Sequence, residues 1–482
     1  MKNSFLIDYV NNRTCAVLGL GVSNMPLVSL LLDAGAEVTV YDKRDVLELG
    51  DGALEFERRG VRFIKDGSFE HVDGELIFRS PGIRPDKAGI VTALERGAEL
   101  TSEIELLLRC CHAKMYAITG SDGKTTTTTL TGKFLLGAAK EKGGNVYVGG
   151  NIGEPLLDRC ESMLPGDRTV LELSSFQLMT LGDSPEHVAI TNVSPNHLDW
   201  HTDMDEYVKA KKNIIGARTK RLVTNADCSI TFGIARENMQ NDNLEIVLFS
   251  SKKSSFEAIF EGMATRENCL AIYAKSEGIY VADAQSETLV LSLDDIKIPG
   301  THNIENYMTA IGLTFKDVPV GTYSSVAKDF FGVEHRLEFV RRIDGVDYYN
   351  SSIDSSPSRT AAALSALASR RVVLICGGYD KKIPYEPLAR AICEHGGIRA
   401  VSLTGATGEK IRAQIEKYRQ ENGKGGEIKL EYTADFYGAV EFARSVAKDG
   451  DALVLSPASA SFDAFKNFME RGNVFKEIVK NF

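Results

Sequence analysis

The sequence predicts an α/β protein of three domains, and three observations lead to this prediction. The chain has 482 residues, which is too long for one ordinary domain. Short apolar strand patterns alternate with helical patterns along most of its length, as in parallel βαβ units. Glycine turns directly follow several of these strands. Hydrophobic content of 43% and charged content of 25% are ordinary for a soluble globular protein.

Residues 1–101 form the first predicted domain, which is Rossmann-like. The stretch "TCAVLGLGVSNMPLVSLLLDAGAEVTVYDKR" indicates strand, glycine turn, helix and strand, and "ELIFRSPGI" indicates a later strand that ends at a turn. Gly19 and Gly21, with Asp42 after the second strand, nearly match the dinucleotide fingerprint, but Asn24 replaces its third glycine. The pattern favours a nucleotide diphosphate over NAD specifically, and a purely structural turn is the alternative.

The second predicted domain, residues 102–331, opens with "KMYAITGSDGKTTTTTL". Its loop reads G-x-x-G-K-T and is two residues shorter than the common P-loop, G-x-x-x-x-G-K-[ST]. Backbone N–H groups and the start of a helix would still converge on an anion there. Lys124 adds a positive charge, and the Thr125 hydroxyl can bind Mg²⁺. The sequence therefore predicts a P-loop-type ATPase sheet, with an ordinary turn before a helix as the alternative.

Glu172 ends the predicted strand "RTVLEL" of the same domain. An acid at the carboxyl end of a strand can bind a metal beside a phosphate loop, although a surface carboxylate would look the same. Ser174 and Gln177 have the spacing of a capping box, which leaves Glu172 unexplained.

The passage "TNVSPNHLDWHTDMDEYVKAKKNII" combines a predicted polar cluster with an amphipathic helix. His197, Asp199 and His201 follow a strand, and Asp203-x-x-Glu206 has the spacing of a second capping box. Lys211 shares the apolar face of the helix, whereas Lys209 and Lys212 point elsewhere. Lysine is rarely buried without a partner, so the alternative is that Lys211 extends along the surface to reach water.

Residues 230–298 are polar and show short alternating strand patterns, which predict an antiparallel patch added to the central sheet. The stretch "GVEHRLEFV" has the character of a domain junction, where Arg336 could reach a phosphate. A third, Rossmann-like domain is expected over residues 332–482. Its segments "ICGGYDKK" and "LSPASASFDAFKNF" each follow a strand, where open α/β sheets bind ligands.

Composition excludes several classes of function. The net charge of −10 gives no basic footprint for nucleic acid. The eight cysteines contain no C-x-x-C pair, which favours a reducing cytoplasm over a zinc site or a disulfide framework. The N-terminus lacks an apolar signal core, and no run approaches the ~18 apolar residues of a membrane span. We therefore expect a cytoplasmic protein that does not associate with membranes.

Taken together, the motifs resemble those of the Mur ligases, the ATP-dependent enzymes that add amino acids to the cell-wall precursor. The resemblance covers essentially the whole chain. The short ATP loop of the family is G-x-x-G-K-[ST]-T, which matches the loop of this sequence. The stretches "LELSSFQL" and "SPASASFDAFKNFMERGN" are most similar to the member that adds D-glutamate to UDP-N-acetylmuramoyl-L-alanine. The other stretches that carry it are "GSDGKTT", "GGNIGEPL", "NVSPNHLDWH", "YVKAKKNI", "GTHNIENYMTAI", "GVEHRLE" and "CGGYDKK".

The resemblance implies a role for each matching residue. It implies two Mg²⁺ ions, a carbamylated Lys211 that acts as a carboxylate, catalytic roles for Lys124, His197 and Lys211, an acyl-phosphate intermediate and a monomer. The ATP-binding residues would be Gly120, Ser121, Asp122, Gly123, Lys124, Thr125, Thr126, Asn303, Asn306 and Arg336, and the metal ligands Thr125, Glu172, His197 and Lys211. The UDP substrate would contact Gly21, Val22, Ser23, Asp42, Lys43, Ser80 and Asn151, and D-glutamate would contact Lys381, Ser461, Phe462 and Phe468.

The chain departs from the family in one loop. Many members have Asn-Asp-Ser-Lys-Ala-Thr-Asn where this sequence has "YYNSSIDSSPS", so Ser351 and Ile353 replace an aspartate and a lysine. Asp354 lies near enough in sequence to substitute in part. Two alternatives therefore stay open: a related ligase for another amino acid, and a nucleotide-binding module without catalysis. Among related ligases, the uridine-type first domain argues against a folylpolyglutamate synthase.

Overall fold

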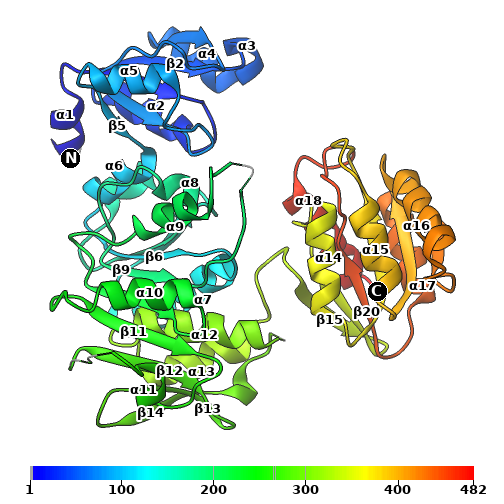
Figure 1. Cartoon of the computed structure of the whole chain (residues 1–482). Helices are drawn as coiled ribbons and strands as arrows, with labels where there is room; N and C mark the ends of the chain where they lie inside the picture. The colour runs from blue at the N-terminus through cyan, green and yellow to red at the C-terminus, as the bar shows by residue number, and fades with distance from the viewer. Residues whose placement is uncertain (1–3, 199, 264, 266, 299) are drawn as a thin grey trace. The chain divides into compact units, whose positions relative to one another are not determined.

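The computed structural model describes residues 4–198, 200–263, 265, 267–298 and 300–482. The chain forms two compact units, residues 1–329 and 330–482. Helices and strands alternate along the chain (Figure 1). The strands of the described residues form three sheets, in which most neighbouring strands pair in parallel. The predicted α/β class is confirmed, while the division of the first unit near residue 101 stays a prediction.

The first sheet has the order β3-β2-β1-β4-β5, and its strands pair in parallel. The order reverses between β1 and β4, so the loops after these two strands meet at a switch point, where open α/β sheets bind ligands. The strands are β1 (Thr14–Leu18), β2 (Glu37–Asp42), β3 (Arg62–Lys65), β4 (Leu76–Arg79) and β5 (Glu99–Thr101); the helices are α1 (Ser4–Val10), α2 (Asn24–Asp33), α3 (Val46–Leu49), α4 (Asp51–Arg58) and α5 (Ala88–Glu95).

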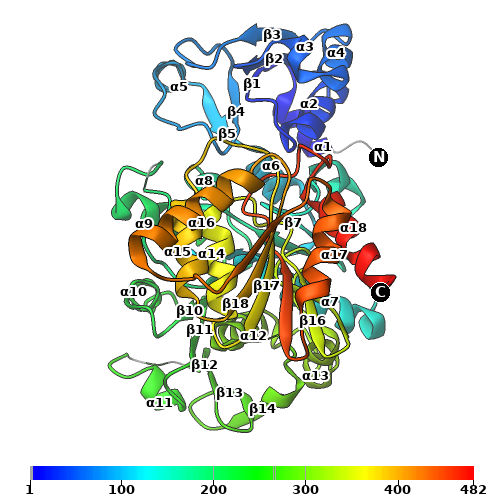
Figure 2. The ribbon, with the colours of Figure 1, turned by 90° about the vertical axis from the view of Figure 1, so that its right-hand side faces the viewer.

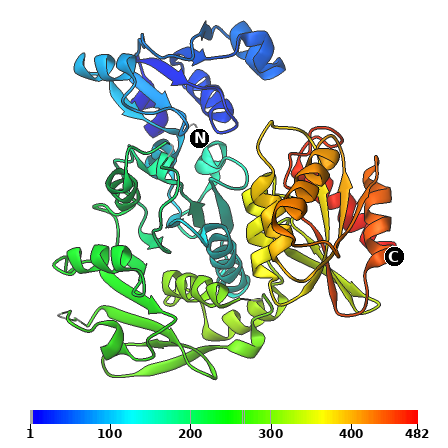
Figure 3. The same ribbon diagram turned by 45° about the vertical axis from the view of Figure 1, so that its right-hand side comes forward.

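The second sheet has nine strands in the order β14-β13-β12-β11-β10-β9-β6-β8-β7. Helix α7 packs on β6, β7 and β8 and against α12, and is the long cyan helix of Figure 3. The strands are β6 (Lys114–Thr119), β7 (Val146–Gly150), β8 (Arg168–Glu172), β9 (His187–Ile190), β10 (Arg221–Asn225), β11 (Glu245–Ser250), β12 (Cys269–Ala274), β13 (Gly278–Ala282) and β14 (Glu287–Ser292). The helical elements are α6 (Glu103–Cys110), α7 (Lys124–Lys142), η1 (Leu157–Ser162), α8 (Ser175–Leu178), α9 (Met204–Lys212), α10 (Ser229–Glu237), α11 (Phe256–Ile259), η2 (Leu293–Asp295), α12 (Thr301–Thr314) and α13 (Val320–Asp329).

The segment 230–298 is only partly the antiparallel patch that its sequence suggests. Strand β11 pairs in parallel with β10 and β12, and the antiparallel pairs are β12–β13 and β13–β14. All six residues of β11, "EIVLFS", are buried. A strand covered on both faces has a continuous apolar pattern, and this one continues the parallel sheet into the segment.

The second unit contains one sheet of order β15-β16-β20-β17-β18-β19, in which only β15 pairs antiparallel. Helices α14, α15 and α16 cover one face and α17 and α18 the other, each over its own hydrophobic core (Figure 2). The strands are β15 (Glu338–Ile343), β16 (Val346–Asn350), β17 (Arg371–Gly377), β18 (Ile398–Thr404), β19 (Lys429–Tyr432) and β20 (Asp451–Leu455); the helices are α14 (Pro357–Ala366), α15 (Glu386–Glu394), α16 (Gly408–Asn422), α17 (Phe436–Val446) and α18 (Phe468–Lys480).

In the described part of the chain, no helix combines the length and apolar character needed to cross a membrane.

Candidate active site

The short glycine loop connects β6 directly to α7 and is packed tightly. Gly120 has φ 146°, and a Cβ there would lie 1.9 Å from Thr191 Oγ1. Gly123 has φ 80°, and a Cβ there would lie 2.3 Å from Asn306 Oδ1. Both positions therefore require glycine for conformation and for space.

Lys124 is the first residue of α7, and its side chain folds back over the loop. Its Nζ donates to the carbonyls of Gly120 at 3.0 Å and Ser121 at 2.9 Å. The ammonium thus lies against the loop, beside the N-terminus of α7, where a phosphate would be attracted by both.

Asn303 and Asn306 reach the same loop from α12, nearly two hundred residues later in the chain. Asn306 is buried, its Oδ1 accepts from Thr127 Oγ1 at 3.3 Å, and its Nδ2 donates to Asn303 Oδ1 at 3.0 Å. The fold therefore brings these two predicted nucleotide-binding residues to the phosphate loop.

Glu172 ends β8, next to β6, and is 2% exposed. Its Oε1 accepts from Asn151 Nδ2 at 3.0 Å, whereas Oε2 is buried without a hydrogen-bond partner. A buried carboxylate oxygen that makes no hydrogen bond is costly, and a bound cation would satisfy it. The residue therefore fits Mg²⁺. Among the described residues there is no group of three or more His, Cys, Asp and Glu that could hold a metal, so such an ion would need other ligand types as well.

Lys211 on α9 is buried, at 1% exposure, and does not extend to the surface. Its Nζ donates to the Gly120 carbonyl at 2.7 Å and lies 4.5 Å from the centre of the Tyr207 ring. Burial, with a smaller contribution from the charge of Lys124, lowers the pKa of Lys211 to about 7. A large fraction of this amine is therefore neutral and nucleophilic near neutral pH.

The loop between β9 and α9 carries the predicted histidine cluster. His197 is exposed, has φ 55°, and its ring lies 5.0 Å from that of Phe176. His201 is buried: its Nε2 lies 2.9 Å from Ser175 Oγ and its Nδ1 3.1 Å from Glu206 Oε2. Both ring nitrogens of His201 therefore have protein partners. Asp199 lies outside the described residues.

The two predicted capping boxes have different outcomes. Ser174 and Gln177 form a complete box at the start of α8. Asp203 accepts from the backbone of Glu206 at 2.8 Å, but the Glu206 carboxylate accepts from Arg84 instead of closing a box. The second prediction is therefore half wrong, because a partner 122 residues earlier in the chain competes for that carboxylate.

At the switch point of the first sheet, Gly19 has φ 77° and its carbonyl accepts from Asn24 Nδ2 at 2.8 Å and Ser80 Oγ at 2.9 Å. Asn24, which stands in place of the third glycine, is buried, and its hydrogen bond to Gly19 closes the turn. Asp42 accepts from the Leu20 backbone at 2.8 Å and from Arg44 at 3.0 Å, so its carboxylate holds the loop together. The other predicted UDP contacts here, Gly21, Val22, Ser23 and Lys43, are exposed or half-buried.

In the second unit, the two predicted ligand loops meet at the carboxyl ends of β17 and β20. The Tyr379 backbone donates to the Ala460 carbonyl at 2.9 Å, and the ring of Tyr379 lies 6.0 Å from that of Phe462, which is 63% exposed. Ser461 is buried and Lys381 is exposed.

Phe468 begins α18, and its ring lies 5.8 Å from that of His335.

Asp354 is buried, accepts from Ser456 Oγ at 2.8 Å, and has a pKa raised by burial. Its carboxylate is therefore engaged inside the unit.

Sequence reasoning missed the buried Arg471 in α18. Its guanidinium donates to the carbonyls of Ser352, Ser459 and Ala460 at 2.9–3.0 Å. It thus connects the loop that differs from the family pattern, which contains Ser352, to the predicted amino-acid loop. An arginine beside Gly472, in the first turn of α18, was the available signal. Arg84, directly after the Ser80-Pro81-Gly82 turn, was missed as well.

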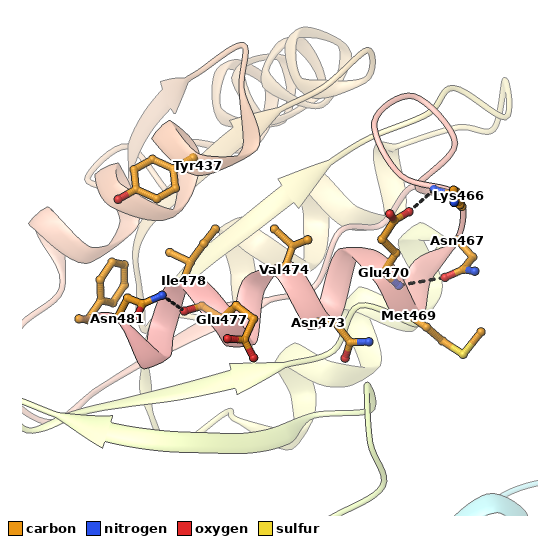
Figure 4. A pocket seen from close by; sticks show the side chains of 11 residues that line it. Tyr437, Lys466, Asn467, Met469, Glu470, Asn473, Val474, Glu477, Ile478 and Asn481 are labelled. Carbon is orange, nitrogen blue, oxygen red and sulfur yellow. Dashed lines mark hydrogen bonds between the residues drawn. The ribbon is translucent and has the colours of Figure 1, made fainter.

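A hollow of about 650 Å³ lies beside α18 (Figure 4). Several of its side chains make local bonds: Glu470 accepts from the Lys466 backbone at 2.6 Å, and Asn467 from the Glu470 backbone at 2.9 Å. None of the described residues that line it is a predicted site residue, so it does not mark the candidate active site.

Comparisons with known proteins give the family. Residues 118–314 match the Mur ligase middle domain, and residues 335–459 match the Mur ligase, glutamate ligase domain. The UDP-N-acetylmuramoylalanine–D-glutamate ligase of Ruminiclostridium cellulolyticum is 43% identical over 476 residues, which is 98% of this chain and 97% of that protein. The chain belongs to the Mur ligase family. The enzyme of the same name from Clostridium novyi is 43% identical to this Mur ligase over 487 residues, which covers both chains completely.

Solved structures show the same fold. The UDP-N-acetylmuramate–alanine ligase of Thermotoga maritima matches this Mur ligase with a TM-score of 0.52 at 16% identity, over 98% of this chain and 100% of that one. A UDP-N-acetylmuramoylalanyl-D-glutamyl-2,6-diaminopimelate–D-alanyl-D-alanyl ligase from Acinetobacter baumannii matches with a TM-score of 0.52 at 12% identity, over 96% and 90%.

Proposed function

We propose that this Mur ligase forms the amide bond between UDP-N-acetylmuramoyl-L-alanine and D-glutamate at the expense of ATP, in peptidoglycan precursor synthesis. The observation that carries the proposal is 43% identity along the whole chain to enzymes named for this reaction. Because that similarity covers 98–100% of this chain, it includes the second unit, which carries the predicted amino-acid pocket.

The chemistry begins with the meeting of two anions. The alanyl carboxylate of the substrate attacks the γ-phosphorus of ATP, forms an acyl phosphate and releases ADP. Lys124 screens the repulsion, and backbone N–H groups of residues 123–126 hold the phosphates at the N-terminus of α7. Asn303 and Asn306 of α12, and Arg336, would contact the nucleotide.

Two Mg²⁺ ions are part of the proposal, and Thr125, Glu172, His197 and Lys211 would hold them. When bound, they neutralise the phosphate charge that develops during transfer. The partnerless buried oxygen of Glu172 supports this role. Lys211 would bind as a carbamate: its neutral amine adds to CO₂ and loses one proton, which gives an N–COO⁻ group. The lowered pKa of the buried Lys211 supports the reaction, because only the neutral amine is a nucleophile.

The amine of D-glutamate then attacks the activated carbonyl, phosphate leaves, and an amide remains after loss of a proton to His197 or to water. Lys381, Ser461, Phe462 and Phe468 would form the D-glutamate pocket. Gly21, Val22, Ser23, Asp42, Lys43, Ser80 and Asn151 would contact the UDP substrate.

Each of three domains would hold one substrate. The first and third, residues 1–101 and 332–482, would be Rossmann-like, and the second, residues 102–331, would contain the ATPase sheet. We also propose that the enzyme is a monomer and acts in the cytoplasm.

The replacement of the family's aspartate and lysine by Ser351 and Ile353 keeps two other functions in view, namely ligation of another amino acid and nucleotide binding without catalysis. Phosphate release by the purified protein with ATP, Mg²⁺ and UDP-N-acetylmuramoyl-L-alanine separates them. We expect release that requires D-glutamate. Release that requires a different amino acid instead would refute the proposed specificity, and ATP binding without release would favour the module.

A further inference from the structure

The loop that carries His197 is held by an arginine from the first sheet. Arg84, which follows β4, donates to the Trp200 carbonyl at 2.6 Å and to the two Glu206 carboxylate oxygens at 2.9 and 3.2 Å. Its guanidinium also lies 5.1 Å from the centre of the Trp200 ring. The indole Nε1 of Trp200 donates back to the Gly82 carbonyl at 3.4 Å. Contacts therefore run in both directions between residues 82–84 and residues 200–206.

The Glu206 carboxylate passes this contact on to the core of the site. Besides Arg84, it accepts from the Thr202 backbone at 3.0 Å and lies 3.1 Å from His201 Nδ1. The opposite nitrogen of His201 lies 2.9 Å from Ser175 Oγ, at the start of α8 and three residues after Glu172. The His201 backbone in turn donates to the His197 carbonyl at 2.9 Å. One short chain of contacts thus links Arg84 to the segments that carry two of the predicted metal ligands, Glu172 and His197.

The other end of the chain reaches the predicted UDP site. Ser80, which holds the Gly19 turn, lies four residues before Arg84. Arg79, 1% exposed, holds the segment between them by donating to the carbonyls of Pro81 at 3.1 Å and Ile83 at 2.7 Å. Its second terminal nitrogen donates to the Phe176 carbonyl of α8 at 2.8 Å. The turn that would contact the UDP substrate is therefore connected by hydrogen bonds to the segments that carry Glu172 and His197.

We propose that Arg84 is a positioning residue for the ligation, which holds the His197 loop in register with the substrate turn through Glu206 and Trp200. The inference rests on the proposed function. It goes further by assigning a role to Arg84, Glu206 and Trp200, none of which would touch a reacting atom. A purely structural brace between two sheets would affect folding alone, whereas a positioning residue affects turnover in protein that is fully folded.

The chain has one tryptophan, so the fluorescence of Trp200 reports on this loop without a label. The variants are Arg84→Met, Arg84→Lys and Glu206→Gln. The matched control is Arg59→Met, which removes a salt bridge between Arg59, at the end of α4, and Asp33, at the end of α2. In Arg84→Met we expect Trp200 to become more accessible to acrylamide, kcat to fall on the order of tenfold or more, and the Mg²⁺ concentration for half-maximal rate to rise.

The same variant should leave the KM for D-glutamate unchanged, because the proposed pocket for that substrate belongs to the second unit. Arg84→Lys keeps the charge but loses the forked contact, so it should lie between wild type and Arg84→Met. The double variant Arg84→Met/Glu206→Gln should be little worse than either single one. Arg59→Met should match the wild type in quenching and in kcat.

Wild-type quenching and wild-type kcat in Arg84→Met would overturn the proposal, as would a fall in kcat that merely follows the loss of folded protein. If Arg84→Met does not fold, Glu206→Gln is judged by the same measurements. If the wild type shows no D-glutamate-dependent phosphate release, the proposed function is contradicted. If acrylamide quenching of Trp200 nevertheless differs between the wild type and Arg84→Met, the contact itself remains established.

Discussion

At the residue scale, Lys211 and Glu206 both have partners that lie about a hundred residues away in the chain. The helical spacing of Tyr207, Lys211 and Ile214 predicts an inward lysine, and Lys211 is indeed buried. Nothing in that spacing identifies the Gly120 carbonyl as its acceptor, because the two lie 91 residues apart. Glu206 illustrates the same limit, since its local capping role gives way to Arg84 from another sheet. Local rules fail where long-range charge pairing offers a stronger interaction.

The carbamate proposal for Lys211 can be tested directly. Lys211→Ala should lose activity, on the order of a hundredfold or more as expected for a lost ligand. In CO₂-depleted buffer, added bicarbonate should raise the activity of the wild type and leave the variant unchanged. Lys209→Ala, on the exposed face of α9, is the control and should behave like the wild type. Full activity of Lys211→Ala would rule the carbamate out.

At the element scale, strand–turn–helix units were predictable because glycine turns and apolar runs mark both ends of each strand. The glycine loop between β6 and α7 was predicted to bind phosphate from its Gly, Lys and Thr residues. Its surroundings, where Thr191 and Asn306 fill the space beside it, are visible only in the fold. Strand β11 was misassigned to an antiparallel patch, since a strand buried on both faces cannot be distinguished by alternation.

The two ends of α7 offer a matched pair of glycines. Gly123 has φ 80° and Gly143 has φ 78°, but only Gly123 lies against another side chain, that of Asn306. Gly143→Ala should therefore cost about 1 kcal/mol of unfolding free energy, from backbone strain alone. Gly123→Ala should cost more and should also abolish ATP binding, as measured by urea unfolding and calorimetry. Equal effects of the two substitutions on both measurements would contradict the packing argument.

Glu103 at the start of α6 gives the first unit a pH-dependent stability. Burial, with a smaller contribution from Asp158, raises the pKa of Glu103 to about 7. Because the folded state binds this proton more tightly than the unfolded state, the stabilisation is complete below about pH 4.5 and is lost as the pH rises through 7. The wild type should therefore lose about 3 kcal/mol relative to Glu103→Gln across this window. Urea unfolding at several pH values measures the difference, and Glu95→Gln, at an exposed position, should give a profile parallel to that of the wild type.

At the scale of the whole molecule, the third sheet and its junction were predictable because "GVEHRLEFV" precedes a new series of strand signals. This motif lies just after the division between the two compact units, at residues 329 and 330, where no linker rich in Pro, Gly or Ser marks the boundary. Each unit has its own hydrophobic clusters, which is the physical requirement for independent unfolding.

Two arginine–carboxylate pairs, each with a buried carboxylate, test that independence, one in each unit. Arg221 of β10 pairs with Glu245 and donates to the carbonyls of Gly312 and Leu313 in α12. Arg399 of β18 donates to both oxygens of the fully buried Asp451, at 2.6 and 3.1 Å. Removing Arg399 leaves the buried Asp451 carboxylate without its salt-bridge partner, which costs about 3 kcal/mol. Glu245 keeps its salt bridge to Lys316 when Arg221 is removed, so that loss costs less. In calorimetry, Arg399→Met should lower the transition of the second unit by roughly 5–10 °C. Arg221→Met should lower the transition of the first, longer unit by less, and the double variant should show both shifts unchanged. A single transition that both substitutions lower would instead mean that the chain unfolds as one cooperative body.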